Sequence, residues 1–230
     1  MHKRLDESPM TDASIPNVSP LPRAEHLAAS PRLFANPILD ALSRTHWTAP
    51  LFYLIPVAYL LQEAAAQLAP LTLVLSVALG YVAWTLTEYT AHRHLFHWEL
   101  PGELGARIHF LIHGIHHDHP SDPWRLVMPP LMSVPLIGIT WAVMSLAVGA
   151  PLKYPLMAGF VIGIVFYDQL HFHLHVRRPT TRIGVWLRRV HMIHHFRDPE
   201  RCFGVSAPYW DYLFGTSQRI PDEKRTRNKQ

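Results

Sequence analysis

Four long hydrophobic segments alternate with polar stretches along the chain. They cover about residues 49–69, 71–90, 130–150 and 154–172. A helix that crosses a bilayer needs about 20 mostly apolar residues, and about 17 are tolerated. The last three segments meet this length, whereas the first, which contains Pro56, meets it only if it continues to residue 69. Any one segment could be a buried helix of a soluble domain, but four in series with almost no charge predict an all-α membrane protein with about four transmembrane helices.

The regions before and after these segments have different patterns. Residues 1–30 are polar and contain four prolines, so we expect a flexible tail. In residues 31–47, five apolar side chains between Leu33 and Leu42 form a stripe opposite charged ones. This stripe predicts a helix that lies in the membrane interface, and an ordinary amphipathic helix of a soluble domain is the alternative. Residues 216–230 are expected to be a solvated basic tail.

The basic residues predict how the segments are oriented. They concentrate before the first segment, between the second and third, and after the fourth, whereas the other two connections carry only Glu63 and Lys153. Cytoplasmic loops are enriched in Lys and Arg, so both termini are expected in the cytoplasm. Residues 91–127 and 173–215 would then form a cytoplasmic helical cap, and residues 31–215 together would form one membrane domain.

Composition supports a membrane protein and excludes several other classes. Charged residues make up 17% of the 230 residues, below the roughly 25% that is usual in soluble domains, and hydrophobic residues make up 49%. Beside such hydrophobic segments, the net charge of +4 is expected to favour anionic lipid headgroups and not nucleic acid. The single cysteine, Cys202, excludes an intrachain disulfide and a cysteine-based zinc finger or iron–sulfur site.

Histidine is the residue type that points to chemistry, because fourteen of the 17 histidines lie between residues 92 and 195. Ten of them have ligand-like spacing: His92, His97, His113, His116, His117, His171, His175, His191, His194 and His195. In each H-x-x-H-H group, the spacing i, i+3, i+4 is expected to turn all three rings toward one point. His92 and His97 are about 140° apart on a straight helix, so a bend or a helix end is expected there.

Ten imidazoles exceed what a single ion binds, so they predict two ions with up to five nitrogens each. Imidazole binds iron, zinc, copper and nickel, and the spacing does not name the metal. Five acids near the histidines are expected either to bond the far ring nitrogens or to be solvated: Glu88, Asp118, Asp122, Asp168 and Asp198. Asp168 is the best candidate for such a bond, because it follows an apolar run and lies three residues before His171.

The chain resembles the fatty acid hydroxylase superfamily, and within it the fatty acid (sphingolipid) 2-hydroxylases, in the motifs EYTAHRHLFH, HGIHHDHP, RLVMPP, HFHLH, HMIHHF and FGVSAPYWDYLFGT. The resemblance covers most of residues 31–215. It implies that the ten histidines hold two iron ions, with zinc as an alternative occupant in purified samples, and that O2 is the cosubstrate. Six residues would then support the ligands or face the substrate: His94, His109, His119, Tyr167, Asp168 and His173.

The activity implied by this resemblance is hydroxylation at C2 of a fatty acyl chain, free or within a sphingolipid or ceramide. Many eukaryotic relatives carry an N-terminal cytochrome b5 domain. Residues 1–30 are expected to be a tail, so a separate cytochrome b5-like or ferredoxin-like protein is expected to supply electrons. The exact lipid, its chain length and the oligomeric state do not follow from the sequence.

Two alternatives stand beside this activity. The same scaffold could act on a sterol or a carotenoid, or the chain could be a histidine-rich metal transporter or store. A transporter needs polar ligands near the bilayer midplane, and the interiors of the hydrophobic segments lack histidine and acid, which argues against transport.

Overall fold

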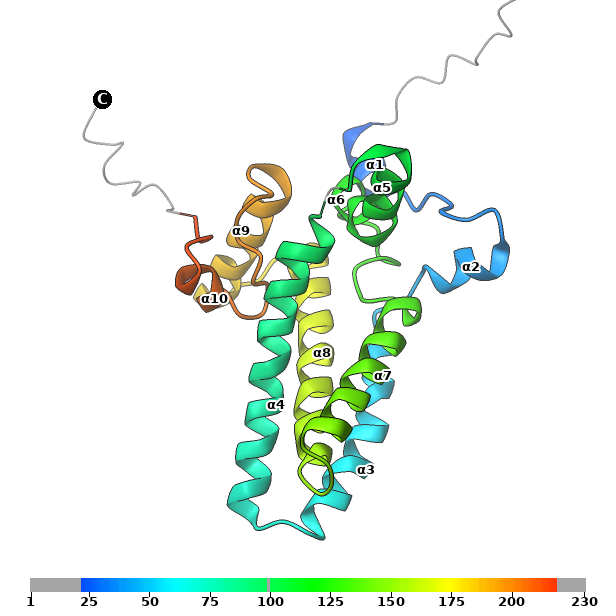
Figure 1. Ribbon diagram of the computed structural model, residues 1–230. Helices are drawn as coiled ribbons and strands as arrows, with labels where there is room; N and C mark the ends of the chain where they lie inside the picture. The colour runs from blue at the N-terminus through cyan, green and yellow to red at the C-terminus, as the bar shows by residue number, and fades with distance from the viewer. Residues whose placement is uncertain (1–21, 99, 219–230) are drawn as a thin grey trace, which may run out of the picture.

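Long helices stand side by side in a bundle, and shorter helices gather at one of its ends (Figure 1). The computed structural model describes residues 22–98 and 100–218, and its described residues contain no strand. The bundle helices are α3 (Leu54–Ala65), α4 (Pro70–Ala91), α7 (Pro130–Ala147) and α8 (Lys153–Val176). The predicted all-α architecture is therefore confirmed.

Three helical stretches are long and apolar enough to cross a membrane: Pro70–Phe96, Pro130–Ala147 and Lys153–Val176. The segment predicted at residues 49–69 is shorter than expected. It forms the 3-10 helix η1 (Ala49–Tyr53) followed by α3, and this apolar stretch ends at Ala65. The structure thus supports three of the four expected spans by length, because the first helix stops before the continuation that it needed.

Helix α8 is the centre of the bundle and packs along α4, α3 and α7. Small residues allow its closest approach, which is to α4. A Cβ on Gly80 would lie 1.9 Å from the carbonyl oxygen of Leu156, and a Cβ on Gly159 would lie 2.0 Å from the carbonyl oxygen of Val77. Such contacts let the backbones of two membrane helices approach closely and fix their register. The register matters because α4 leads into His92 and His97, and α8 carries His171 and His175.

The cap at one end of the bundle contains α5 (Gly102–His109), α6 (Ile115–Asp118), α9 (Arg182–Phe196) and α10 (Tyr209–Leu213). Two π-helical turns complete it: η2 (His92–Phe96) continues α4, and η3 (Phe110–Gly114) joins α5 to α6. Helix α1 (Arg23–Ala28) also lies at this end of the molecule (Figure 1). All ten predicted ligands therefore lie in the cap or at the helix ends that enter it.

The N-terminal region differs from its prediction in two places. Helix α1 forms within the stretch expected to be a tail, and α2 (Pro37–Leu42) occupies only part of the helix expected over residues 31–47. The side chain of Asn36 caps α2, and the carboxylate of Asp40 accepts the backbone N–H of Leu33 at 2.7 Å. The backbone before α2 is thus bonded to a side chain instead of continuing a helix. Most of the tails predicted at residues 1–30 and 216–230 lies outside the described residues, which begin at 22 and end at 218.

Candidate metal centre

The ten predicted ligands form two groups of five rings. The first histidine group contains His92, His97, His113, His117 and His194. The second histidine group contains His116, His171, His175, His191 and His195. Within each group, one nitrogen from every ring lies within 4.8 Å of the nitrogens of the others. The structure therefore brings together all ten histidines that the sequence singled out, and it divides them evenly.

Each H-x-x-H-H motif contributes to both groups, so the prediction that its three rings meet at one point is wrong. His113 and His117 belong to the first group, whereas His116 belongs to the second. In α9 the pattern is reversed, because His194 belongs to the first group. Residues i+3 and i+4 of a helix are about 100° apart around its axis, so one helix between two sites can serve both.

The π-turn η2 brings His92 and His97 to the same group. The backbone N–H of His97 donates to the carbonyl oxygen of His92 at 3.3 Å, which is the i to i+5 bond of a π-helix. The two ring centroids are 5.1 Å apart. A straight α-helix would have pointed these rings in different directions, so the predicted departure from α-helical geometry at this pair is confirmed.

Backbone carbonyl groups orient rings in both histidine groups. The Nδ1 of His92 donates to the carbonyl of Phe203 at 2.6 Å, and the Nδ1 of His171 donates to that of Leu126 at 2.7 Å. A ring whose Nδ1 carries hydrogen has Nε2 free for a metal. The expectation that Asp168 bonds a ring directly is wrong, because its Oδ1 accepts the backbone N–H of Met128 at 2.9 Å and its buried Oδ2 has no hydrogen-bond partner.

Two other acids, Glu88 and Asp211, bond the backbone near the rings. Glu88 accepts hydrogen bonds from the backbone N–H groups of Val205 and Ser206, and Asp211 accepts those of Phe203 and Gly204. These bonds shape the loop that carries the carbonyl facing His92. The remaining three expected acids have partners elsewhere: Asp118 pairs with His26 and His119, Asp122 with Arg125, and Asp198 with Arg201.

The two groups fit metal ions. The Nε2 atoms of His92 and His117 each lie 3.1 Å from that of His113. Adjacent ligands at 90° around an ion, with bonds of about 2.1 Å, would be separated by roughly 3.0 Å. In the second group, both ring nitrogens of His116 are buried and have no hydrogen-bond partner. Lone pairs this close repel one another unless a cation lies between them, so the geometry favours a metal at each group.

The rings are also in the protonation state that metal binding requires. Burial, together with the nearby ring of His194, lowers the pKa of His97 to about 3. Burial lowers the pKa of His194 to about 4. Burial also lowers the pKa values of His113 and His191. The rings are therefore neutral near pH 7, as nitrogen ligands must be.

The additional residues named from the sequence have separate positions. Tyr167 stacks on the ring of His171, with centroids 5.5 Å apart and planes 5° apart. His109 lines a surface pocket beside His117. His173 is exposed, and its Nδ1 donates to the carbonyl of Gln169 in the same helix. His94 is exposed and lies outside both groups, and His119 pairs with Asp118. Only Tyr167 therefore has the ring contact expected of a supporting residue.

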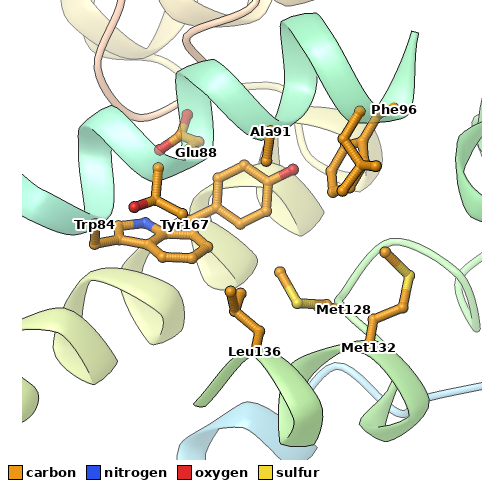
Figure 2. Close-up of a pocket in the computed structure, with 10 residues that line it drawn as sticks. Trp84, Glu88, Ala91, Phe96, Met128, Met132, Leu136 and Tyr167 are labelled. Atoms are coloured by element: carbon orange, nitrogen blue, oxygen red, sulfur yellow. The ribbon is translucent and has the colours of Figure 1, made fainter. Parts of the chain in front are cut away.

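An apolar cavity of about 120 Å³ lies between α4, α7 and α8 (Figure 2). Trp84, Leu136 and Met132 are among its lining residues. A second pocket, lined by rings from both histidine groups, shares Phe96, Met128, Met132 and Tyr167 with it. Two of these shared residues are aromatic, and each stacks on a ring of one histidine group. The ring centroid of Phe96 lies 5.2 Å from that of His113 in the first group, and Tyr167 stacks on His171 in the second.

The carbonyl partners and Phe96 were not identified from the sequence. Every residue carries a carbonyl, so the carbonyls of Phe203 and Leu126 have no signal of their own. The motifs FGVS and WDYLFGT did contain a signal, because Asp211 of the second motif accepts hydrogen bonds from the backbone of the first. Phe96 lies within the motif HRHLFH, one residue before a ligand.

Comparisons with known proteins agree with this geometry. Residues 77–216 match the fatty acid hydroxylase family. A dihydroceramide fatty acyl 2-hydroxylase of Arabidopsis thaliana is 36% identical, over 81% of this chain and 79% of the relative. A fatty acid 2-hydroxylase of Homo sapiens is 33% identical, over 80% of this chain and 56% of the relative. Among solved structures, full-length scs7p, with only its hydroxylase domain visible, matches with a TM-score of 0.77 and 34% identity, over 82% of this chain and 72% of that one. The chain belongs to the fatty acid hydroxylase family.

Proposed function

We propose that the protein is a diiron membrane enzyme that hydroxylates C2 of a fatty acyl chain, either free or within a ceramide or related sphingolipid. Its relatives are named for this reaction and for ceramide or fatty acyl substrates. The observation that carries the proposal for this chain is the apolar cavity. It lies between the membrane helices and shares four lining residues with a pocket that both histidine groups line.

The ten histidines would hold two ions, one at each histidine group. Iron is the metal that suits the reaction, because it changes oxidation state and zinc does not; zinc is the alternative occupant of purified protein. When bound, the iron pair would supply the activation of O2 that breaking an unactivated C–H bond requires. The carbonyls of Phe203 and Leu126 would orient the rings of His92 and His171 by accepting their Nδ1–H groups.

The cavity would bind the acyl tail and place C2 beside the ions. Trp84, Leu136 and Met132 offer an apolar surface to methylene groups. Phe96 stacks on a ring of the first histidine group and Tyr167 on a ring of the second. The acyl chain would therefore pass between two aromatic side chains that contact the two groups. The carboxyl end would then face the histidine groups, and the hydrocarbon walls would exclude water from the reacting carbon.

The proposed topology places the cap and both termini in the cytoplasm, following the distribution of basic residues. A separate cytochrome b5-like or ferredoxin-like protein would deliver electrons there. The pocket that His109 and His117 line opens at the cap surface, next to a ligand of the first histidine group. A donor that docks on this surface would be close to the ions.

Lipid mass spectrometry on cells grown with acyl chains deuterated at C2 tests the proposal. Wild-type protein is expected to yield lipids that have lost one deuterium and gained one oxygen. His116→Ala is expected to give none, since His116 lies within the second group. His173→Ala is the matched control, because this exposed ring lies outside both groups, and it is expected to retain activity.

The result that would contradict the proposal is a wild-type protein that binds metal but changes no acyl lipid. Sterol or carotenoid oxidation in the same cells would then favour the same scaffold acting on another lipid. Product in the His116→Ala cells equal to that in wild type would argue that the second histidine group has no role in the reaction.

A further inference from the structure

A third cluster of side chains of the types that bind metals lies outside both histidine groups. Asp118 Oδ1 is 3.2 Å from Nε2 of His26, and Asp118 Oδ2 is 3.3 Å from Nε2 of His119. One ligand atom from each of the three lies within 4.8 Å of the others. His26 belongs to α1, whereas Asp118 ends α6 and His119 follows it. The fold therefore brings a residue from the N-terminal region to the end of a ligand-bearing helix.

The hydrogen bonds of His119 leave its other nitrogen available to a cation. Its Nδ1 lies 2.6 Å from the carbonyl oxygen of His26, which can only accept, so Nδ1 carries the hydrogen. Its Nε2 faces a carboxylate oxygen of Asp118 at 3.3 Å, so a cation between them would bind both atoms. A bond from the far nitrogen to a carbonyl is also the usual support of a metal-bound histidine.

The three side chains are close enough to share one ion. The Nε2 atoms of His26 and His119 each lie within 3.3 Å of a carboxylate oxygen of Asp118, and one ligand atom from each residue lies within 4.8 Å of the others. A zinc ion held by three protein ligands takes water as its fourth ligand and is tetrahedral. His119 is buried, whereas 46% of the His26 side chain and 51% of the Asp118 side chain are exposed, so water can reach a fourth position. We propose that His26, Asp118 and His119 bind a third divalent ion of the zinc class, which fastens α1 to the cap.

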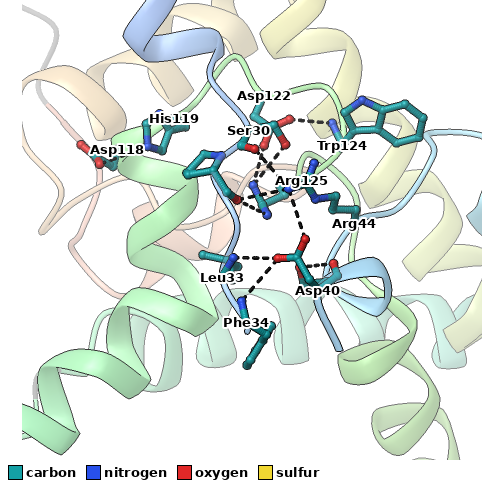
Figure 3. A network of polar contacts seen from close by, with 12 residues as sticks. Ser30, Leu33, Phe34, Asp40, Arg44, Asp118, His119, Asp122, Trp124 and Arg125 are labelled. Carbon is teal, nitrogen blue, oxygen red and sulfur yellow. Dashed lines mark hydrogen bonds and ion pairs between the residues drawn. The ribbon is translucent and has the colours of Figure 1, made fainter. Parts of the chain in front are cut away.

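This ion would extend a set of contacts that already joins the N-terminal region to the loop after α6 (Figure 3). Arg125 donates to the carbonyl of Pro31 at 2.7 Å and pairs with the fully buried Asp122 at 2.9 Å. The next residue, Leu126, accepts the hydrogen bond from His171. The third ion would therefore hold the N-terminal region against the loop that orients a ligand of the second histidine group.

Metal stoichiometry of the full chain tests this inference. The protein is purified in detergent, loaded with excess zinc, desalted and measured by inductively coupled plasma mass spectrometry. Wild type is expected to bind one zinc ion for each of the three groups. His26→Ala and Asp118→Asn are each expected to bind one fewer. His173→Ala removes an exposed histidine outside all three groups and is expected to match wild type.

Cobalt loading gives a second measurement, because tetrahedral cobalt(II) absorbs visible light more strongly than octahedral cobalt(II). The last equivalent is expected to add a tetrahedral band that His26→Ala lacks. Wild type that binds only two ions would overturn the inference. Equal stoichiometry in wild type and both variants would mean an adventitious ion only. Both readouts use metal binding and not lipid turnover, so they stand even if the proposed hydroxylation fails.

Discussion

Replacing Glu88 with alanine is expected to loosen the first histidine group without removing any of its members. The buried Glu88 carboxylate accepts the backbone N–H of Val205 at 2.7 Å, the backbone N–H of Ser206 at 2.8 Å and the Ser206 hydroxyl. These two residues closely follow Phe203, whose carbonyl accepts the hydrogen bond from His92. Glu88→Ala therefore leaves two N–H groups without an acceptor in the loop that positions the ring of His92.

The size of the effect follows from these bonds. Each buried N–H left unpaired costs about 1–3 kcal/mol, so the two together cost about 2–6 kcal/mol. Removing a carboxylate that is unfavourable to bury offsets part of this loss, so we expect a net destabilisation of about 3 kcal/mol. In a chain of this length, that corresponds to a fall in Tm of roughly 6–12 °C. Glu88→Gln keeps an acceptor oxygen for both N–H groups and should stay within about 1 kcal/mol of wild type.

Thermal unfolding in detergent, followed by circular dichroism, measures the stability change, and metal analysis measures occupancy. Glu88→Ala is expected to show the lower Tm and to hold one ion fewer than wild type, because His92 belongs to the first histidine group. Glu88→Gln is expected to match wild type in both. The reasoning is refuted if Glu88→Ala keeps the wild-type Tm and metal content. It also fails if Glu88→Gln is as damaging as alanine, because an acceptor alone would then not explain the role of Glu88.

Two other substitutions test the helix packing and the cavity. Gly80→Leu is expected to prevent α4 from packing on α8, since even a Cβ would lie 1.9 Å from the carbonyl oxygen of Leu156, and size-exclusion chromatography should show aggregated protein. Gly138→Ala in α7 is the control, because nothing lies within 4 Å of its added Cβ, and it should gain up to about 1 kcal/mol from helix propensity. Leu136→Trp fills the apolar cavity and is expected to shift hydroxylation toward shorter acyl chains at unchanged metal content. An unchanged chain-length profile would show that the acyl tail binds elsewhere.

The hydrophobic pattern predicted the bundle better than it predicted the surrounding surface elements. Long runs of apolar residues can form little other than membrane or core helices, and three of the four expected segments have a length that can span a membrane. The helix expected over residues 31–47 was overestimated, because the pattern does not show that Asp40 binds the backbone of Leu33. Side-chain capping of this kind depends on local geometry that periodicity alone does not contain.

The sequence by itself determined which residues could bind metal, and the tertiary structure decided how they are shared. The spacing of His113, His116 and His117 is a local property, so it could be recognised without a structure. Their division between two groups depends on where α8 and α9 place the partner rings, which no local spacing contains. The same holds for His26, which meets Asp118 only because the N-terminal region folds back onto the cap. Long-range contacts arise from the packing of whole helices, and that is why only the folded chain reveals them.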